Sequence, residues 1–139
     1  MKLEDTFELL LDIGSTYSYL PIIIEGIAKE SNGTYDEELE TYTVDCGWKR
    51  SKKNICFNFP KGPNVTASVS DFILTVKQFA ASKKRSDQDT YAFTIFDGDG
   101  YSSMGDDFIG NSYLHYDLED NTVGITPAKF IKKSLVQNV

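Results

Sequence analysis

One carboxylate stands where a run of apolar residues ends. Asp12 directly follows residues 9–11, which are all leucine, and precedes Gly14, Ser15 and Thr16. An aspartate at the end of an apolar strand is costly to desolvate unless it is hydrogen-bonded, and a glycine lets backbone amides approach it while hydroxyls offer further donors. The pattern fits two interpretations, a carboxylate held for acid–base chemistry or a turn carboxylate that caps backbone amides.

Other polar motifs favour a structural interpretation. Asp97 and Asp99 alternate with glycines like part of a calcium loop, but a third acidic position and a closing glutamate are missing, which indicates a plain turn. The basic residues 83–85 indicate a solvated loop. His115, the single histidine, falls on the expected exposed face of a strand, so we expect no catalytic role for it and no metal site in the chain.

Composition excludes several classes of protein. The 139 residues contain 21 Asp and Glu against 14 Lys and Arg, which gives a formal charge of −7. That field repels nucleic acids and anionic membranes and suits a protein that works in acid. No apolar run approaches the roughly 20 residues of a membrane span. The first residues lack the basic and apolar regions of a signal peptide, so we expect neither a membrane span nor a secretion signal.

Two further features leave alternatives open. Asn32 and Asn64 each begin an Asn-x-Thr glycosylation pattern, which has meaning only in the secretory pathway. Cys46 and Cys56 fit either a disulfide across a hairpin or two buried thiols.

The elements that would position Asp12 are predicted to be mainly β-strands. An apolar strand over residues 6–11 ends at the Asp12 turn, and a short helix is predicted over residues 21–31, with proline at its start and Asn-Gly after its end. Residues 41–44 and 55–59 are predicted to pair as a hairpin around the polar loop 47–54.

The remaining segments support the same fold class. They are an extended segment over 65–69, a helical turn at 70–74, an ambiguous segment 76–81, a strand over 91–96, a helical turn at 106–110, and a hairpin of strands 112–118 and 122–126. We therefore expect a mainly β fold, a barrel-like or orthogonally packed sandwich.

The Asp12 motif resembles the active-site loop of pepsin-like aspartic proteases, in which Asp-x-Gly-Ser/Thr follows an apolar strand. Later segments resemble, in the same order, the C-terminal lobe of the fungal branch, the yapsins and secreted fungal aspartic proteases. These segments are residues 42–46, 57–59, 70–74, 104–108 and 112–121, and the resemblance covers the chain from about residue 6 to residue 130.

The resemblance implies the C-terminal lobe of the bilobal acid protease barrel fold, mainly β with one or two short helices. It also implies an aspartic endopeptidase that hydrolyses peptide bonds in acid without metal or cofactor. Asp12 would be the catalytic aspartate of this lobe, and Gly14, Ser15 and Thr16 would orient its carboxylate and bind the substrate backbone. Residues 104–105 would pack behind the loop.

Several positions depart from the pattern of the family that the chain resembles. Ile13 stands where the family has Thr or Ser, whose hydroxyl bonds to the other lobe. Ser103 replaces an aliphatic residue that packs behind the aspartate. The family's disulfide would join Cys46 to the position of Ala92, so this bridge is absent unless Cys56 substitutes for it.

The resemblance also implies that half of the catalytic machinery is missing. We expect residues 1–139 to be a single partial domain, a truncated second lobe without the first, because the chain has no other Asp-x-Gly-Ser/Thr motif. Cleavage of a peptide or protein substrate would need the missing lobe or a second copy. The alternative is a non-catalytic, degenerate lobe that is inert or binds peptides. Family members are secreted or anchored at the cell surface, whereas we expect neither a signal nor an anchor in these residues, so the resemblance does not assign a location to this chain.

Overall fold

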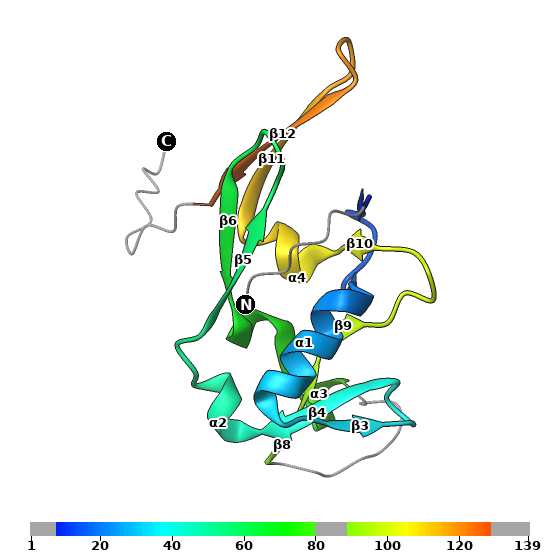
Figure 1. The fold of residues 1–139 in the computed structure, drawn as a ribbon, viewed down its shortest axis with the longest axis vertical. Helices are drawn as coiled ribbons and strands as arrows, with labels where there is room; N and C mark the ends of the chain where they lie inside the picture. Colours follow the sequence, from blue (N-terminus) through cyan, green and yellow to red (C-terminus); the bar gives the residue numbers. More distant parts are fainter. Residues whose placement is uncertain (1–7, 80–88, 129–139) are drawn as a thin grey trace, which may run out of the picture.

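The computed structural model describes residues 8–79 and 89–128, which form four small sheets and several short helices. Figure 1 shows helix α1 (Pro21–Ser31) near the centre, with two hairpins extending away on one side of it and a group of strands on the other. The hairpins are β5 (Asn54–Asn58) with β6 (Asn64–Ser68), and β11 (Ser112–Asp117) with β12 (Thr122–Pro127).

The first sheet interleaves strands from distant parts of the chain. Its order is β1-β10-β2-β9, with β1 parallel to β10, β10 antiparallel to β2, and β2 parallel to β9. The strands are β1 (Leu10–Leu11), β2 (Ser18–Tyr19), β9 (Ile95–Phe96) and β10 (Ser103–Met104). Because β10 lies between β1 and β2, the connection from β1 to β2 must cross the end of β10.

The second sheet is antiparallel throughout, with the order β3-β4-β8-β7. Its strands are β3 (Thr34–Asp36), β4 (Thr41–Asp45), β7 (Ile73–Thr75) and β8 (Thr90–Phe93). The single strand predicted over residues 91–96 is divided between the two sheets. It breaks at Thr94, whose backbone N–H donates to Phe72 O at 2.8 Å. The chain crosses from the second sheet to the first at this residue.

Helix α1 confirms the prediction over residues 21–31. Pro21 occupies the first turn, where its missing N–H costs nothing, and Asn32 ends the helix in the left-handed region with φ 55°. Ile23, Ile24 and Ile27 point into the core. The other helices are short: α2 (Cys46–Lys49), the 3-10 turn η1 (Val69–Phe72), α3 (Val76–Phe79) and α4 (Asp106–Ile109).

The predicted hairpin of residues 41–44 and 55–59 is wrong. Strand β4 pairs with β3 and β8, whereas β5 pairs with β6. The physical reason lies in the intervening segment, where Asp45 caps α2 by accepting a 2.6 Å hydrogen bond from Gly47 N and redirects the chain. The turn after β5, closed by Gly62 N donating to Phe59 O at 2.9 Å, then provides the local partner β6.

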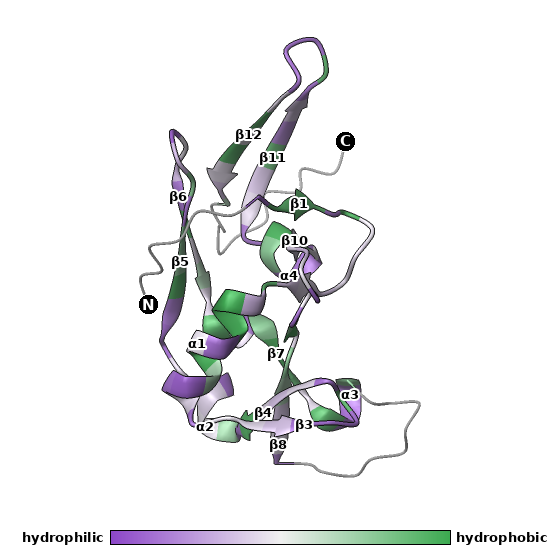
Figure 2. Ribbon diagram, turned by 45° about the vertical axis from the view of Figure 1, so that its right-hand side comes forward, coloured by the Kyte–Doolittle hydropathy of each residue, from purple (hydrophilic) through white to green (hydrophobic). Residues whose placement is uncertain are grey.

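One main cluster of buried side chains joins these elements. Phe72, Phe93 and Phe108 are fully buried and come from η1, β8 and α4. They pack in one cluster with the isoleucines of α1 and the inward residues of β5 and β6. Figure 2 shows these hydrophobic segments of α1 and α4 toward the middle of the molecule. Burial of such rings is the main stabilising contribution.

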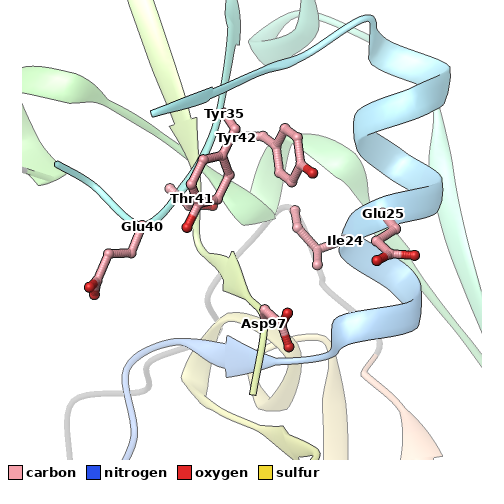
Figure 3. A pocket seen from close by; sticks show the side chains of 7 residues that line it. All are labelled: Ile24, Glu25, Tyr35, Glu40, Thr41, Tyr42 and Asp97. Carbon is pink, nitrogen blue, oxygen red and sulfur yellow. The ribbon is translucent and has the colours of Figure 1, made fainter. Parts of the chain in front are cut away.

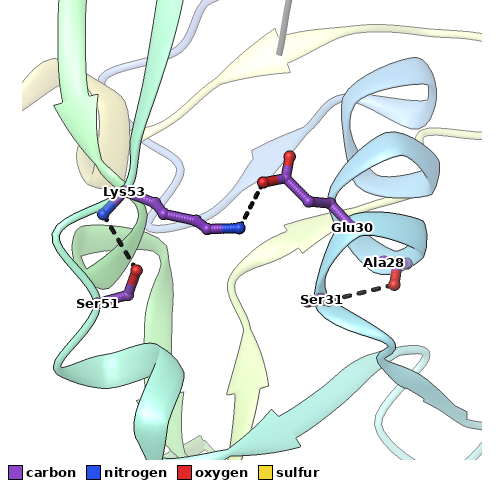
Figure 4. Close-up of polar contacts among 5 residues, drawn as sticks. All are labelled: Ala28, Glu30, Ser31, Ser51 and Lys53. Carbon is purple, nitrogen blue, oxygen red and sulfur yellow. Dashed lines mark hydrogen bonds and ion pairs between the residues drawn. The ribbon is translucent and has the colours of Figure 1, made fainter.

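An exposed ion pair connects α1 to the segment that leads into β5. Lys53 Nζ lies 2.6 Å from Glu30 Oε1, as Figure 4 shows. The same ammonium lies 4.7 Å from the centroid of the Trp48 ring, a cation–π contact. Both side chains of the pair are about half exposed, so we expect only a small contribution to stability.

The mainly β fold class with a few short helices is confirmed, and so is the terminal hairpin of β11 and β12. The sheets stay open within residues 8–79 and 89–128, so the barrel-like closure expected from the sequence is not found there. The helical turns predicted at 70–74 and 106–110 correspond to η1 and α4, and residues 76–79 of the ambiguous segment form α3. The basic residues 83–85 lie outside the described residues. No helix in the described ranges is long and apolar enough to cross a membrane.

Candidate active site

Residues 12–17 connect β1 to β2 and are called the Asp12 loop below. The loop begins where Asp12 N donates to Met104 O of β10 at 3.0 Å, and Ser15 N closes a turn by donating to Asp12 O at 3.2 Å. It ends at Ser18, the first residue of β2. The loop therefore arches over the end of the central strand β10.

The carboxylate of Asp12 is oriented by one backbone amide. Gly14 N donates to Asp12 Oδ1 at 3.0 Å, and a Cβ at position 14 would lie 3.3 Å from the same oxygen, closer than most real contacts. Within the described residues this amide is the only hydrogen-bond donor to the Asp12 carboxylate. Asp12 is half-buried, and its second oxygen, Oδ2, accepts no hydrogen bond from the described residues.

The two hydroxyls predicted to assist Asp12 do not contact its carboxylate. Ser15 Oγ donates to Tyr17 O at 3.1 Å, within the loop. Thr16 is exposed, and Ile13 is 71% exposed on the same loop. The structure thus brings Gly14 to Asp12, whereas Ser15 stiffens the loop and Thr16 faces solvent.

The segment after β10 packs directly behind the Asp12 loop. Asp106 N donates to Ser15 O at 2.9 Å. A Cβ at Gly105 would lie 2.6 Å from Ser15 O and closer still to Tyr17 O, distances that real Cβ atoms do not show. The corner at residues 104–105 is therefore shaped so that only glycine lets the two backbones approach.

Sequence reasoning missed Asp107, the second residue of α4. Its carboxylate accepts hydrogen bonds from Ser18 N at 3.2 Å, from Ser18 Oγ, from Thr94 Oγ1 at 2.8 Å and from Phe108 N at 2.9 Å. Burial raises the pKa of Asp107, and the hydrogen bonds from Ser18, Thr94 and Phe108 oppose that shift. The motif at 104–108 drew attention to this segment, but no local signal indicates partners 89 residues away in sequence.

Aromatic rings extend from the neighbourhood of Asp12. The Tyr101 and Tyr19 ring centroids lie 5.3 Å apart, and those of Tyr19 and Phe96 lie 5.5 Å apart. Tyr17, Phe79 and Phe96 contact one another, with centroid distances of 5.4 to 5.8 Å. Desolvation raises the pKa of the Tyr101 hydroxyl, and the nearby Tyr19 and Asp12 raise it further. These rings give the surface beside the Asp12 loop an apolar character.

Neither of two prominent hollows of the described surface includes a residue of the Asp12 loop. One, of about 270 Å³, lies between α1, the β3–β4 hairpin and Asp97, where Figure 3 shows the Tyr35 and Tyr42 rings close together. The other, of about 750 Å³, lies beside α4 and is lined by polar residues including Lys49, Asp71 and Asp107. The Asp12 loop thus lines neither of these hollows.

The remaining candidate residues give no sign of chemistry. Cys46 and Cys56 are both free thiols, and Ala92 pairs with Thr43 and Leu74 rather than facing Cys46. His115 is exposed on β11. Across residues 8–79 and 89–128, no three His, Cys, Asp or Glu side chains gather so as to hold a metal ion.

Comparison with known proteins gives relatives along almost the whole chain. Secreted aspartic protease 7 of Candida albicans is 31% identical over 132 residues, which cover 94% of this chain and 21% of that protein. Aspartic proteinase yapsin-3 of Saccharomyces cerevisiae is 29% identical, covering 87% and 22%. Candidapepsin-3 of Candida albicans is 30% identical, covering 91% and 31%. The chain spans about a fifth to a third of the length of these relatives.

The resemblance drawn from the motifs is confirmed by these relatives and by a family-wide match. The sequence pattern described as eukaryotic aspartyl protease matches residues 1–128. The mainly β architecture with a few short helices is consistent with a lobe of a pepsin-like protein. Since the match covers more than half of the chain, the chain belongs to the eukaryotic aspartyl protease family.

Proposed function

We propose that this chain is the second lobe of an aspartic endopeptidase and that Asp12 is one of the two aspartates that hydrolyse the peptide bond. In this proposal residues 1–139 form one partial domain. The observation that carries it is the Asp12 loop, in which Gly14 N donates to one carboxylate oxygen at 3.0 Å while the other accepts no hydrogen bond from the described residues. Membership in the aspartyl protease family gives this geometry its chemical meaning.

The chemistry follows from placing a second carboxylate opposite Asp12. Two carboxylates about 3 Å apart cannot both ionise, so they share one proton. The ionised partner takes a proton from a water molecule, which attacks the peptide carbonyl, while the protonated partner donates to the carbonyl oxygen. Because one acid must be protonated, the reaction favours acid pH, and it uses no metal or cofactor.

The substrate in this proposal is a peptide or protein laid across the Asp12 loop. Gly14, Ser15 and Thr16 bind its backbone, and the exposed Thr16 hydroxyl is the group best placed to do so. The aromatic rings around Tyr19 and Phe96 offer apolar contacts to its side chains. Secretion, which the name of the Candida relative states for that protein, belongs to the same proposal.

The opposing aspartate comes from another lobe or from a second copy related by a two-fold axis. The sequence of 139 residues contains a single Asp-x-Gly-Ser/Thr motif. The β11–β12 hairpin supports the need for such a partner, because Tyr113 is 68% exposed, Leu118 is 85% exposed, and Tyr116 and Val123 are also exposed. A lobe that covers this hairpin would remove apolar surface from water.

A second candidate function is peptide binding without cleavage. Ile13 favours it, because this 71% exposed side chain has no hydroxyl to bond across to an opposing loop. In that case the Asp12 loop is a structural turn that can still contact an extended peptide.

Cleavage of a quenched fluorescent peptide at acid pH separates the two candidates. The chain is assayed alone and together with the first lobe of Secreted aspartic protease 7, with and without a transition-state inhibitor of aspartic proteases. We expect inhibitor-sensitive cleavage that Asp12→Asn abolishes. Asp99→Asn is the matched control, because Asp99 is exposed with φ 47°, a conformation that asparagine adopts readily.

Sedimentation at the same pH completes the test. Cleavage by the chain alone requires a dimer, whereas cleavage only with the added lobe assigns the second aspartate to that lobe. Peptide binding with no cleavage in either arrangement would establish the second candidate.

A further inference from the structure

A partly buried carboxylate that the proposed reaction does not use lies directly behind the Asp12 loop. Asp107 accepts hydrogen bonds from both the N–H and the hydroxyl of Ser18, where the loop enters β2. It also accepts from Thr94 Oγ1 at 2.8 Å, at the crossover between the two sheets. One side chain therefore connects α4, β2 and the crossover.

The contact with Ser18 reaches the rest of the loop. Ser18 Oγ donates to Asp107 and accepts from Gly105 N at 3.1 Å. Asp106 N, between these two residues in sequence, holds Ser15 O at 2.9 Å. Ser18 and Thr94 are 0% and 2% exposed, so water cannot easily replace these bonds.

We propose that Asp107 is a positioning residue that fixes the end of the Asp12 loop to α4 and to the crossover at Thr94. The importance of this position for catalysis rests on the proposed function. The positioning itself is a property of the folded chain and is tested below without any catalytic readout.

The network specifies a carboxyl group rather than an amide. Oδ1 accepts from the hydroxyl of Ser18 and from Phe108 N, while Oδ2 accepts from Ser18 N and from the hydroxyl of Thr94. Each oxygen thus faces one backbone N–H, which can only donate. An asparagine amide would turn two donors toward one of these N–H groups and leave it without an acceptor.

The surroundings of Asp107 make this attachment sensitive to pH. Among the described residues, the partners of Asp107 in the network are all uncharged. The charged groups that share its cleft are Asp106 on the same helix, Asp71 of η1 and Lys49 of α2, and the Lys49 ammonium binds the carbonyls of Ser70 and Ile73 at 2.7 and 2.8 Å. The negative charge of Asp107 is therefore stabilised mainly by uncharged hydrogen-bond donors at a partly buried position.

The direction of the pH dependence follows from burial. In the closed state, in which the Asp12 loop is held against α4, burial raises the pKa of Asp107 above its ordinary 3.8. When the loop moves away from α4, the pKa of Asp107 returns toward 3.8, and the carboxyl group releases its proton more readily. The closed state is therefore favoured as pH falls from above the raised pKa toward 3.8, and this gain is lost as pH rises again.

Amide hydrogen exchange of the 139-residue chain between pH 3 and pH 7, corrected for the intrinsic rates, tests this role. The reporting amides are Ser18, Gly105 and Asp106, and the reference is Gly33, which donates to Ala28 O at 2.9 Å at the far end of α1. We expect the protection of the Ser18, Gly105 and Asp106 amides against exchange to rise as pH falls. Asp107→Asn should reduce it about tenfold and remove its dependence on pH, with Gly33 unchanged.

Asp106→Asn is the matched control, because it removes the same charge from the neighbouring exposed side chain, and we expect it to behave like the parent chain. Unchanged protection and unchanged pH dependence in Asp107→Asn would overturn the proposal. An equal loss of protection at Gly33 would indicate general destabilisation of the chain. In that case a second variant, Thr94→Val, tests the proposal.

Thr94→Val removes one donor that lowers the pKa of Asp107, so it should move the midpoint of the pH dependence at Gly105 to higher pH. A midpoint that stays in place would overturn the proposal. If the amides behave as expected while the paired lobes show no cleavage, the proposed function fails and the role of Asp107 stands.

Discussion

Two regions of this chain are built in opposite ways. Strand β10 contributes only two residues, yet Ser103 and Met104 are 2% and 1% exposed and touch strands from both sides. The β11–β12 hairpin pairs six residues on each strand, from Ser112 with Pro127 to Asp117 with Thr122, and most of its side chains are exposed. Figure 1 shows this hairpin projecting from the body.

The difference shows where the Asp12 loop gets its fixed shape. The hairpin forms from neighbours in sequence and tolerates solvent on both faces. The β10 region, which comprises β10, α4 and the Asp12 loop, is determined by contacts between residues about 90 positions apart, such as Ser18 with Asp107. Its shape therefore depends on packing between distant parts of the described chain, and its residues have little freedom to change.

The largest expected effect compares one aromatic side chain from each region. Phe108 is fully buried in α4 with its ring centroid 4.8 Å from that of Phe57. Phe108→Ala should lower the free energy of unfolding by about 3–5 kcal/mol in urea denaturation, because it leaves a cavity. Tyr113→Ala, on the hairpin, should change it by less than about 0.5 kcal/mol. Similar losses in the two variants would remove the contrast between the regions.

The next effect compares glycines. Gly105→Ala should cost about 3 kcal/mol, because the new Cβ would overlap Ser15 O and Tyr17 O, which are backbone atoms that cannot turn away. At Gly124 in β12 the nearest atom would be 3.6 Å away, so Gly124→Ala should be close to neutral. Thermal unfolding of both variants measures the difference. A neutral Gly105→Ala would show that the Asp12 loop can move away from α4.

The same contrast explains which elements the sequence could reveal. Helix α1 carries its start and stop signals in adjacent residues, and the β11–β12 hairpin is closed by a local turn, so both were predictable. The pairing of residues 41–44 with 55–59 was wrong because it assumed that neighbouring strands pair. Only the cap at Asp45 and the turn at Gly62 show that each strand takes another partner.

In the candidate site too, the sequence predicts the local contacts but not the long-range ones. Asp12 and Gly14 lie two positions apart, and their hydrogen bond of 3.0 Å follows from the motif. The motif also drew attention to Ser15 and Thr16, but the structure turns the hydroxyl of Ser15 onto Tyr17 O. The partners of Asp107 could not be predicted, because they depend on the threading of β10 between β1 and β2.

The smallest expected effect concerns an exposed contact that joins distant segments, and it tests whether burial or sequence separation makes the β10 region sensitive. Glu30 and Lys53 lie 23 positions apart but are both about half exposed. Glu30→Gln should lower the free energy of unfolding by only about 0.5 kcal/mol, and less in high salt. Glu25→Gln on the same helix is the control, because the structure shows no ion pair for Glu25 within the described residues.

The pH dependence of this pair has a defined sign. The hydrogen bond from Lys53, together with its charge, lowers the pKa of Glu30 below 4.5. Its contribution is therefore present above pH 4.5 and is lost as pH falls through the lowered pKa, opposite to the direction for Asp107. Chemical denaturation of Glu30→Gln and Glu25→Gln at pH 7 and pH 3 measures this contribution and its pH dependence. A loss in Glu30→Gln as large as that in Gly105→Ala would mean that long-range contacts matter even when water surrounds them, and burial would no longer account for the rigidity behind Asp12.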